Sequence, residues 1–150
     1  MITKTTEKMT TTIKLIKEKD RLSFLPKFMS SETLFQFENQ IYTAMENEVE
    51  GYDGGYYEFY EITSIDGKAP LLIWQTSREE VTVQGMFEDI KTNSFTASLA
   101  INSKVQSQMS FMLQGKDRER MVQQYYALRA WAMDAKDQRV DFAAYFKITD

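Results

Sequence analysis

The sequence contains no cysteine and no histidine among its 150 residues. Disulfides and thiolate metal sites are therefore excluded. So are His-ligated zinc, imidazole acid–base catalysis and a Ser-His-Asp triad. No apolar run approaches the roughly 20 residues that span a bilayer, and the N-terminal "MITKTTEKMTTTIKLIKEK" lacks the continuous apolar stretch of a secretory signal. We expect a cytoplasmic protein that binds no cofactor or metal and makes no membrane contact.

Basic residues are missing from one long stretch of the chain. Residues 28–67 contain nine Asp or Glu and no Lys or Arg, whereas residues 1–27 carry a charge of +4 and residues 68–150 a charge of +1. The net charge is −4. This distribution argues against direct nucleic-acid binding by the acidic stretch and is compatible with a basic partner.

The length and the apolar patterning predict one α+β domain over residues 20–150, preceded by a flexible arm over residues 1–19. A small antiparallel sheet of about three strands is expected to pack with about four α-helices. Within the arm, alternation of Ile13 and Leu15 with lysines is compatible with a short edge strand. The expected strands are 56–63, 71–75 and 80–84, and the expected helices are about 32–49, 94–113, 117–133 and a short one after 137.

Capping and periodicity support the first helix. Ser30 or Ser31 can cap its N-terminus, and Gly51 can stop it. Gly115 is expected to end the second helix. The predicted apolar stripes, with flanking rings, are Leu34, Phe35, Phe37, Ile41, Tyr42 and Met45; Ala97, Ile101, Val105, Met109 and Met112; Met121, Tyr125, Leu128, Trp131 and Ala132; and, in the last helix, Phe142 with Tyr145 or Phe146.

The segment "DRLSFLPKF" at 20–28 contains Pro26, which favours an extended Leu25 and opposes a helix. We therefore expect a strap that pins Phe24, Leu25 and Phe28 to the body of the domain.

The stretch "EGYDGGYYEFYE" at 50–61 combines five rings, four carboxylates and three glycines. The main interpretation is a strand whose rings pack in the sheet core, with Asp53, Gly54 and Gly55 as the turn in front of it; the alternative is a dedicated aromatic site. On a strand Glu58 and Glu61 point to opposite faces, so they cannot form a catalytic pair.

Carboxylates are densest around the end of the first helix. We predict a partner-binding patch of Glu46, Glu48, Glu50 and Asp53, with Glu58 as a further candidate. The alternative is an ordinary solvated acidic face. Two other classes of protein remain open, namely an acidic interaction module for another basic partner and a His-independent enzyme.

Three segments in a fixed order, "RLSFLPKF" (21–28), "YDGGYYEFYEI" (52–62) and "YYALRAWAM" (125–133), resemble the ArdB/KlcA-type antirestriction family. The resemblance implies a structural role for twelve residues, here called the signature residues: Arg21, Phe24, Pro26, Tyr52, Gly54, Gly55, Tyr56, Tyr57, Phe59, Tyr60, Leu128 and Arg129. Leu25, Asp53, Tyr126 and Ala132 match the family as well.

The resemblance implies a small cytoplasmic, non-enzymatic protein encoded on mobile DNA such as a plasmid. It would protect incoming DNA from type I restriction-modification systems, and its partner would be the restriction enzyme or its pathway. True DNA mimics are far more acidic over their whole surface than this chain. A local acidic contact or an indirect action is therefore the expected mechanism.

Overall fold

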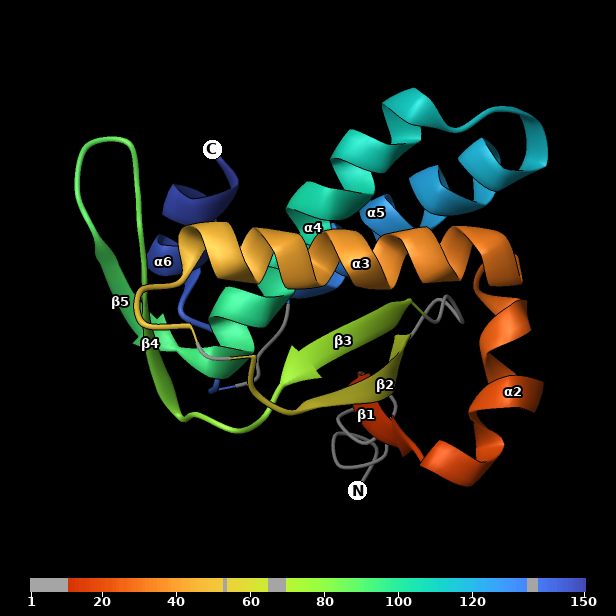
Figure 1. The fold of residues 1–150 in the computed structure, drawn as a ribbon, viewed down its shortest axis with the longest axis horizontal. Coiled ribbons are helices and arrows are strands. Elements are labelled where there is room, and N and C mark those ends of the chain that lie inside the picture. Colours follow the sequence, from red (N-terminus) through yellow and green to blue (C-terminus); the bar gives the residue numbers. More distant parts are fainter. Residues whose placement is uncertain (1–10, 53, 65–69, 135–137) are drawn as a thin grey trace, which may run out of the picture.

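The computed structural model describes residues 11–52, 54–64, 70–134 and 138–150. It shows one α+β domain, as predicted (Figure 1). The elements in chain order are β1 (Thr11–Ile16), η1 (Glu18–Asp20), α2 (Arg21–Phe24), η2 (Leu25–Lys27), α3 (Ser31–Glu48), β2 (Tyr57–Ser64), β3 (Leu71–Gln75), β4 (Glu80–Val83), β5 (Ile90–Asn93), α4 (Ser94–Met112), α5 (Gly115–Asp134) and α6 (Phe142–Thr149). None of the described helices is both long and apolar enough to cross a membrane.

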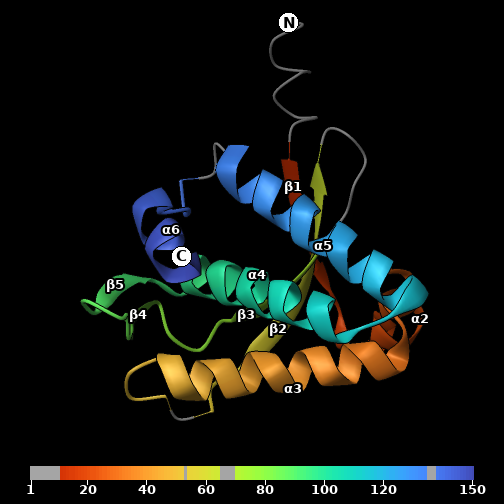
Figure 2. The same cartoon turned by 90° about the horizontal axis from the view of Figure 1, so that it is seen from above.

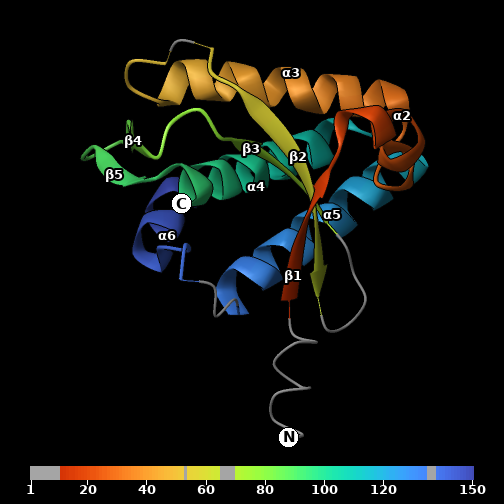
Figure 3. The same cartoon turned by 90° about the horizontal axis from the view of Figure 1, so that it is seen from below.

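The main sheet is antiparallel and has the order β1-β2-β3, with β2 in the centre (Figure 3). Phe59 lies opposite Ile16 on one side and Ile73 on the other. The predicted strands at 56–63 and 71–75 are confirmed almost to the residue. The possible edge strand around Ile13 and Leu15 is β1, so Thr11–Ile16 of the predicted arm takes part in the sheet.

The predicted third strand at 80–84 exists, but its expected place was wrong. β4 pairs with β5 in a separate two-stranded sheet. No strand was predicted at the position of β5. β5 has four residues and alternates buried and exposed side chains over so short a span that periodicity cannot reveal it.

The expectation of an extended strap at 20–28 was also wrong, because η1, α2 and η2 carry the chain through this segment in helical turns. Leu25 is itself helical, with φ −64° and ψ −31°. Pro26 lies in the first turn of η2. An amide there has no intrahelical acceptor, so proline removes no hydrogen bond. Leu25 and Phe28 are buried as expected, whereas Phe24 is partly exposed.

Helix α3 confirms the predicted cap. Ser30 is the N-cap, and its hydroxyl accepts the Thr33 amide at 3.2 Å. Gly51 follows the helix with φ +67°. The buried stripe contains Phe37, Ile41 and Met45, but Phe35 was wrongly included in it.

Helix α4 lies at the centre of the domain, between α3 and α5 (Figure 2). Its N-cap is Asn93, whose Oδ1 accepts the Thr96 amide. Polar side chains facing β3 satisfy the unpaired edge of that strand: Ser98 and Asn102 of α4 and Gln124 of α5 accept the amides of Gln75, Ile73 and Leu71. A buried edge whose amides lacked these acceptors would be unstable.

The remaining helices complete the core. The expectation that Gly115 ends the second helix was wrong, because Leu113 is the C-cap of α4 and Gly115, with φ +59°, is the first residue of α5. Tyr145 of α6 is fully buried and its hydroxyl pairs with Ser103 at 2.9 Å. Two apolar predictions failed, because Phe142 and Met112 point towards solvent.

Candidate functional site

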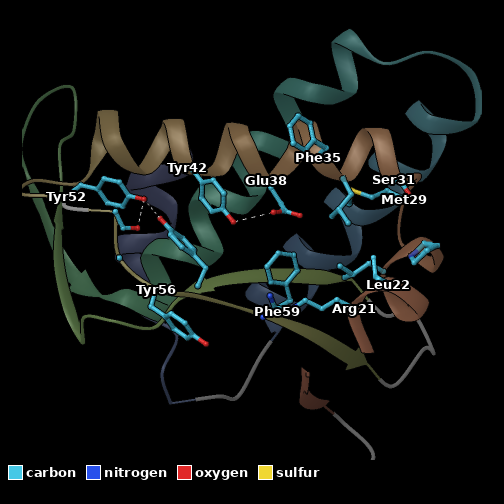
Figure 4. Close-up of a pocket in the computed structure, with 16 residues that line it drawn as sticks. Arg21, Leu22, Met29, Ser31, Phe35, Glu38, Tyr42, Tyr52, Tyr56 and Phe59 are labelled. Atoms are coloured by element: carbon cyan, nitrogen blue, oxygen red, sulfur yellow. Dashed lines mark hydrogen bonds between the residues drawn. The ribbon is translucent and has the colours of Figure 1, made fainter. Parts of the chain in front are cut away.

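A wide groove runs between α2–η2, α3 and the segment that leads into β2 (Figure 4). Its volume is about 740 Å³, within the size range of ligand-binding clefts. Of the sixteen described residues that line it, twelve come from the part of the sequence that lacks basic residues. The lining residues are Arg21, Leu22, Leu25, Pro26, Met29, Ser31, Leu34, Phe35, Glu38, Tyr42, Tyr52, Gly54, Gly55, Tyr56, Tyr57 and Phe59.

One end of the groove is built from tyrosines whose hydroxyl groups bond to one another and to the backbone. The Tyr52 hydroxyl donates to the Gly54 carbonyl at 2.8 Å and lies 2.8 Å from the Tyr57 hydroxyl. Because Tyr52 has a single hydroxyl hydrogen, Tyr57 is the donor in the second bond. The rings of Tyr42 and Tyr57 pack 4.8 Å apart. The tyrosine rings are therefore held in place before anything binds.

Glu38 lies at the middle of the groove, between the tyrosines and Arg21 (Figure 4). The Tyr42 hydroxyl donates to its Oε2 at 3.3 Å, one helical turn away. Burial raises the pKa of the Glu38 carboxyl, and the hydrogen bond from Tyr42 and the charge of Arg21 oppose that rise. Burial, followed by the charge of Glu38, raises the pKa of Tyr42 to about 12. Glu38 is thus a partly desolvated carboxylate beside aromatic rings.

Arg21 occupies the other end of the groove. Its guanidinium carbon lies 4.5 Å from the centroid of the Phe59 ring, a cation–π contact. The buried Nε of Arg21 has no hydrogen-bond partner among the described residues. Arg21 therefore packs on Phe59 of β2 within the groove, and its positive charge lowers the pKa of Glu38 against the effect of burial.

Two glycines allow the chain to turn into β2 beside the tyrosines. Gly54 and Gly55 have φ of +99° and +61°, so both glycines of the predicted turn adopt the left-handed conformation that favours glycine. A Cβ on Gly55 would lie 2.3 Å from Nε2 of Gln75, whereas one on Gly54 would meet nothing. Asp53, which we expected to organise this turn, lies outside the described residues.

The signature residues converge on this groove although they come from segments far apart in the sequence. Eight of the twelve line it: Arg21, Pro26, Tyr52, Gly54, Gly55, Tyr56, Tyr57 and Phe59. The other four lie elsewhere. Phe24 packs on Phe28, and Tyr60 packs on Trp74. Leu128 and Arg129 belong to α5, where Leu128 is buried and the charge of Arg129 opposes the rise that burial causes in the pKa of Tyr145.

The sequence reasoning did not identify the α3 wall of the groove. Leu34, Phe35 and Tyr42 were assigned to the core, and Glu38 was assigned no role. Two signals were available in the sequence. Phe35 does not fit the helical spacing of Phe37, Ile41 and Met45, and Glu38 and Tyr42 are four residues apart and so share one helix face. These residues line the same groove as the tyrosines that the sequence did single out.

The predicted acidic patch is spread over more than one surface. Glu46 and Glu50 are exposed near the end of α3, but Glu48 forms an ion pair with Lys104 of α4. The Glu50 carbonyl lies within 3.4 Å of an Arg78 nitrogen. Glu58 accepts a hydrogen bond from Tyr60, on the sheet face opposite Phe59. Among the described residues, no group of three or more acidic side chains is arranged to hold a metal ion.

Comparison with known proteins identifies the fold. No protein-family model matches the chain, and no curated protein matches it. A solved structure of the KlcA and ArdB proteins is similar over 93% of this chain and 95% of that one, with a TM-score of 0.72 and 23% sequence identity. It is described as a novel fold with antirestriction activity against type I DNA restriction systems in vivo but not in vitro. The chain is therefore a small α+β protein. In particular, it has the KlcA/ArdB fold that its sequence motifs resemble.

Proposed function

We propose that this protein is a member of the KlcA/ArdB family and protects incoming DNA from type I restriction without catalysing a reaction. The observation that carries the proposal is the convergence of eight signature residues on one groove of a domain that shares the KlcA/ArdB fold over nearly its whole length. Arg21 and Pro26 belong to the first resembling segment and the other six residues to the second, so two segments far apart in the sequence meet at one concave surface.

The protein acts in the cytoplasm through a protein of the restriction pathway and does not bind DNA. A chain with a net charge of −4 and a 40-residue stretch without Lys or Arg is a poor ligand for phosphates. Two surfaces are candidates for the contact: the groove, and the acidic residues Glu46, Glu48, Glu50, Asp53 and Glu58. Activity of the solved neighbour in vivo but not in vitro fits an action that needs a further cellular component.

The test is a transformation assay with unmodified plasmid DNA. Recovery is measured in cells with a type I system and in otherwise identical cells without one, each with and without this protein. Recovery should rise only in the restricting cells, and fully modified plasmid should transform all strains equally. Unchanged recovery against several type I systems, with the protein expressed and folded, contradicts the proposal.

A second candidate is an acidic interaction module for a basic partner unrelated to restriction. The charge of −9 over residues 28–67 favours it. Protection in the assay above would reject this candidate, because such a module would leave restriction unaffected.

A further inference from the structure

The rim of the groove is unusually apolar for a surface that faces water. Leu22 is 95% exposed, Phe35 is 69% exposed and Tyr56 is 61% exposed, and all three line this one groove. They come from α2, α3 and the segment before β2, so no single element accounts for their exposure. Exposed apolar side chains around a concave surface are typical of a binding site.

The polar groups inside the groove favour a cation. Among the described residues, Glu38 accepts one hydrogen bond, from Tyr42 at 3.3 Å, which leaves much of its carboxylate capacity unused. The neighbouring charge of Arg21 favours the ionised form of Glu38, and Arg21 itself is already placed over Phe59. A partly desolvated carboxylate next to aromatic rings is a suitable site for a guanidinium or an ammonium group.

The hydroxyl hydrogens of the tyrosines are already bonded within the protein, so they do not repel a bound cation. The hydroxyl of Tyr42 donates to Glu38, that of Tyr52 to the Gly54 carbonyl and that of Tyr57 to the Tyr52 hydroxyl. Their hydroxyl oxygens and ring systems are the parts left for a ligand, and both attract positive charge. Among the described residues, Arg21 is the only basic one that lines the groove.

We propose that the groove is the docking site for a protein segment that inserts an Arg or Lys side chain between Glu38 and the tyrosine rings. Apolar side chains beside that cation would rest on Leu22, Phe35 and Tyr56. This inference deepens the proposed function and rests on it for the biological role of the groove: the occupant would be a segment of a restriction-pathway protein. The occupant is therefore defined by a positive side chain that complements Glu38 and by apolar side chains that complement the rim of the groove.

The binding test uses two short synthetic peptides and the whole protein. One is acetyl-Gly-Leu-Arg-Phe-Gly-amide, and the other has citrulline, the neutral isostere of Arg, in its place. Binding is followed by amide chemical shifts in two-dimensional NMR. The Arg peptide should shift signals from residues 21–42 and 52–59, and its affinity should exceed that of the citrulline peptide about tenfold.

Variants establish whether Glu38 is responsible. Glu38→Gln should bring the affinities for the two peptides together, and Phe35→Ala should weaken both. Glu119→Gln and Phe111→Ala are matched controls on exposed side chains outside the groove and should change neither. The inference is wrong if neither peptide binds, if the shifts map elsewhere, if both peptides bind wild type equally, or if Glu38→Gln keeps the preference for Arg.

The transformation assay separates failure of this inference from failure of the proposed function. Suppose that wild type protects DNA, that folded Glu38→Gln and Phe35→Ala lose protection, and that the two control variants keep it. The proposed function and the groove inference are then both supported. If wild type and both groove variants protect equally, the groove is not the contact site, although the proposed function survives. If wild type does not protect, the proposed function fails, and the peptide measurements still decide what the groove binds.

Discussion

The side chain of Asn102 on α4 binds both backbone groups of Ile73 on β3. Its Oδ1 accepts the Ile73 amide at 3.0 Å, and its Nδ2 donates to the Ile73 carbonyl at 2.8 Å. Both residues are fully buried. One side chain therefore takes the place of a neighbouring strand and allows the sheet to end inside the protein.

Replacing Asn102 by Ala should destabilise the fold by about 3 kcal/mol, because two buried backbone groups of Ile73 would lose their partners. Asn39 is exposed on α3, so Asn39→Ala is the matched control and should change stability by less than about 0.5 kcal/mol. Chemical denaturation of both variants measures this difference. Equal denaturation midpoints would show that the sheet edge does not depend on the Asn102 side chain.

The two glycines before β2 should resist β-branched residues. Gly54→Val and Gly55→Val should each cost about 1 kcal/mol or more, because both positions have positive φ. At Gly55 the new side chain must also displace Gln75. Thermal melting tests this. If both variants melt like wild type, the positive-φ turn is not needed for stability.

The stability of the protein should depend on the ionisation of Glu38. Its pKa is raised above the usual value of 4.5, chiefly by burial, so between the two pKa values the folded state binds more protons than the unfolded state. The free energy of unfolding therefore falls as pH rises through this window. Glu38→Gln lacks that loss, so its stability relative to wild type should increase with pH.

Urea denaturation of wild type and Glu38→Gln at a series of pH values from about 4 to 8 measures this. The difference between them should move in favour of the variant as pH rises and then level off. A constant difference, or one that moves the other way, contradicts the raised pKa. The variant should in any case remain folded at neutral pH, which makes it suitable for the groove experiments.

The acidic residues at the end of α3 can be separated from the groove. A Glu46→Gln/Glu48→Gln/Glu50→Gln variant should stay folded, since Glu46 and Glu50 are exposed and the partly exposed ion pair of Glu48 with Lys104 is worth about 1 kcal/mol at most. Removing negative charge from the C-terminal end of a helix offsets part of that loss.

Transformation of restricting cells with this triple variant then distinguishes the two candidate surfaces. Full protection by a folded triple variant would remove the acidic residues from the mechanism and leave the groove. Loss of protection, with Glu38→Gln still active, would assign the contact to the end of α3.

Local signals in the sequence were sufficient for many of the elements. The Ser30 cap and the apolar stripe predicted α3, and the run from Leu71 to Gln75 is β3 to the residue. The turn at Gly54 and Gly55 was also predictable, because adjacent glycines adopt positive φ at no steric cost. These features depend on neighbours within a few positions along the chain.

The sequence by itself determined the α+β class, the boundaries of the long helices and the absence of histidine and cysteine chemistry. Only the tertiary structure decided that β1 rather than β4 completes the main sheet, that Asn102 closes its edge from 29 residues away, and that Phe35 and Glu38 face a groove with Arg21. The physical reason is that caps, turns and periodicity act between near neighbours. Strand pairing, edge closure and the shape of a groove depend on contacts between distant segments, which the pattern of one sequence does not specify.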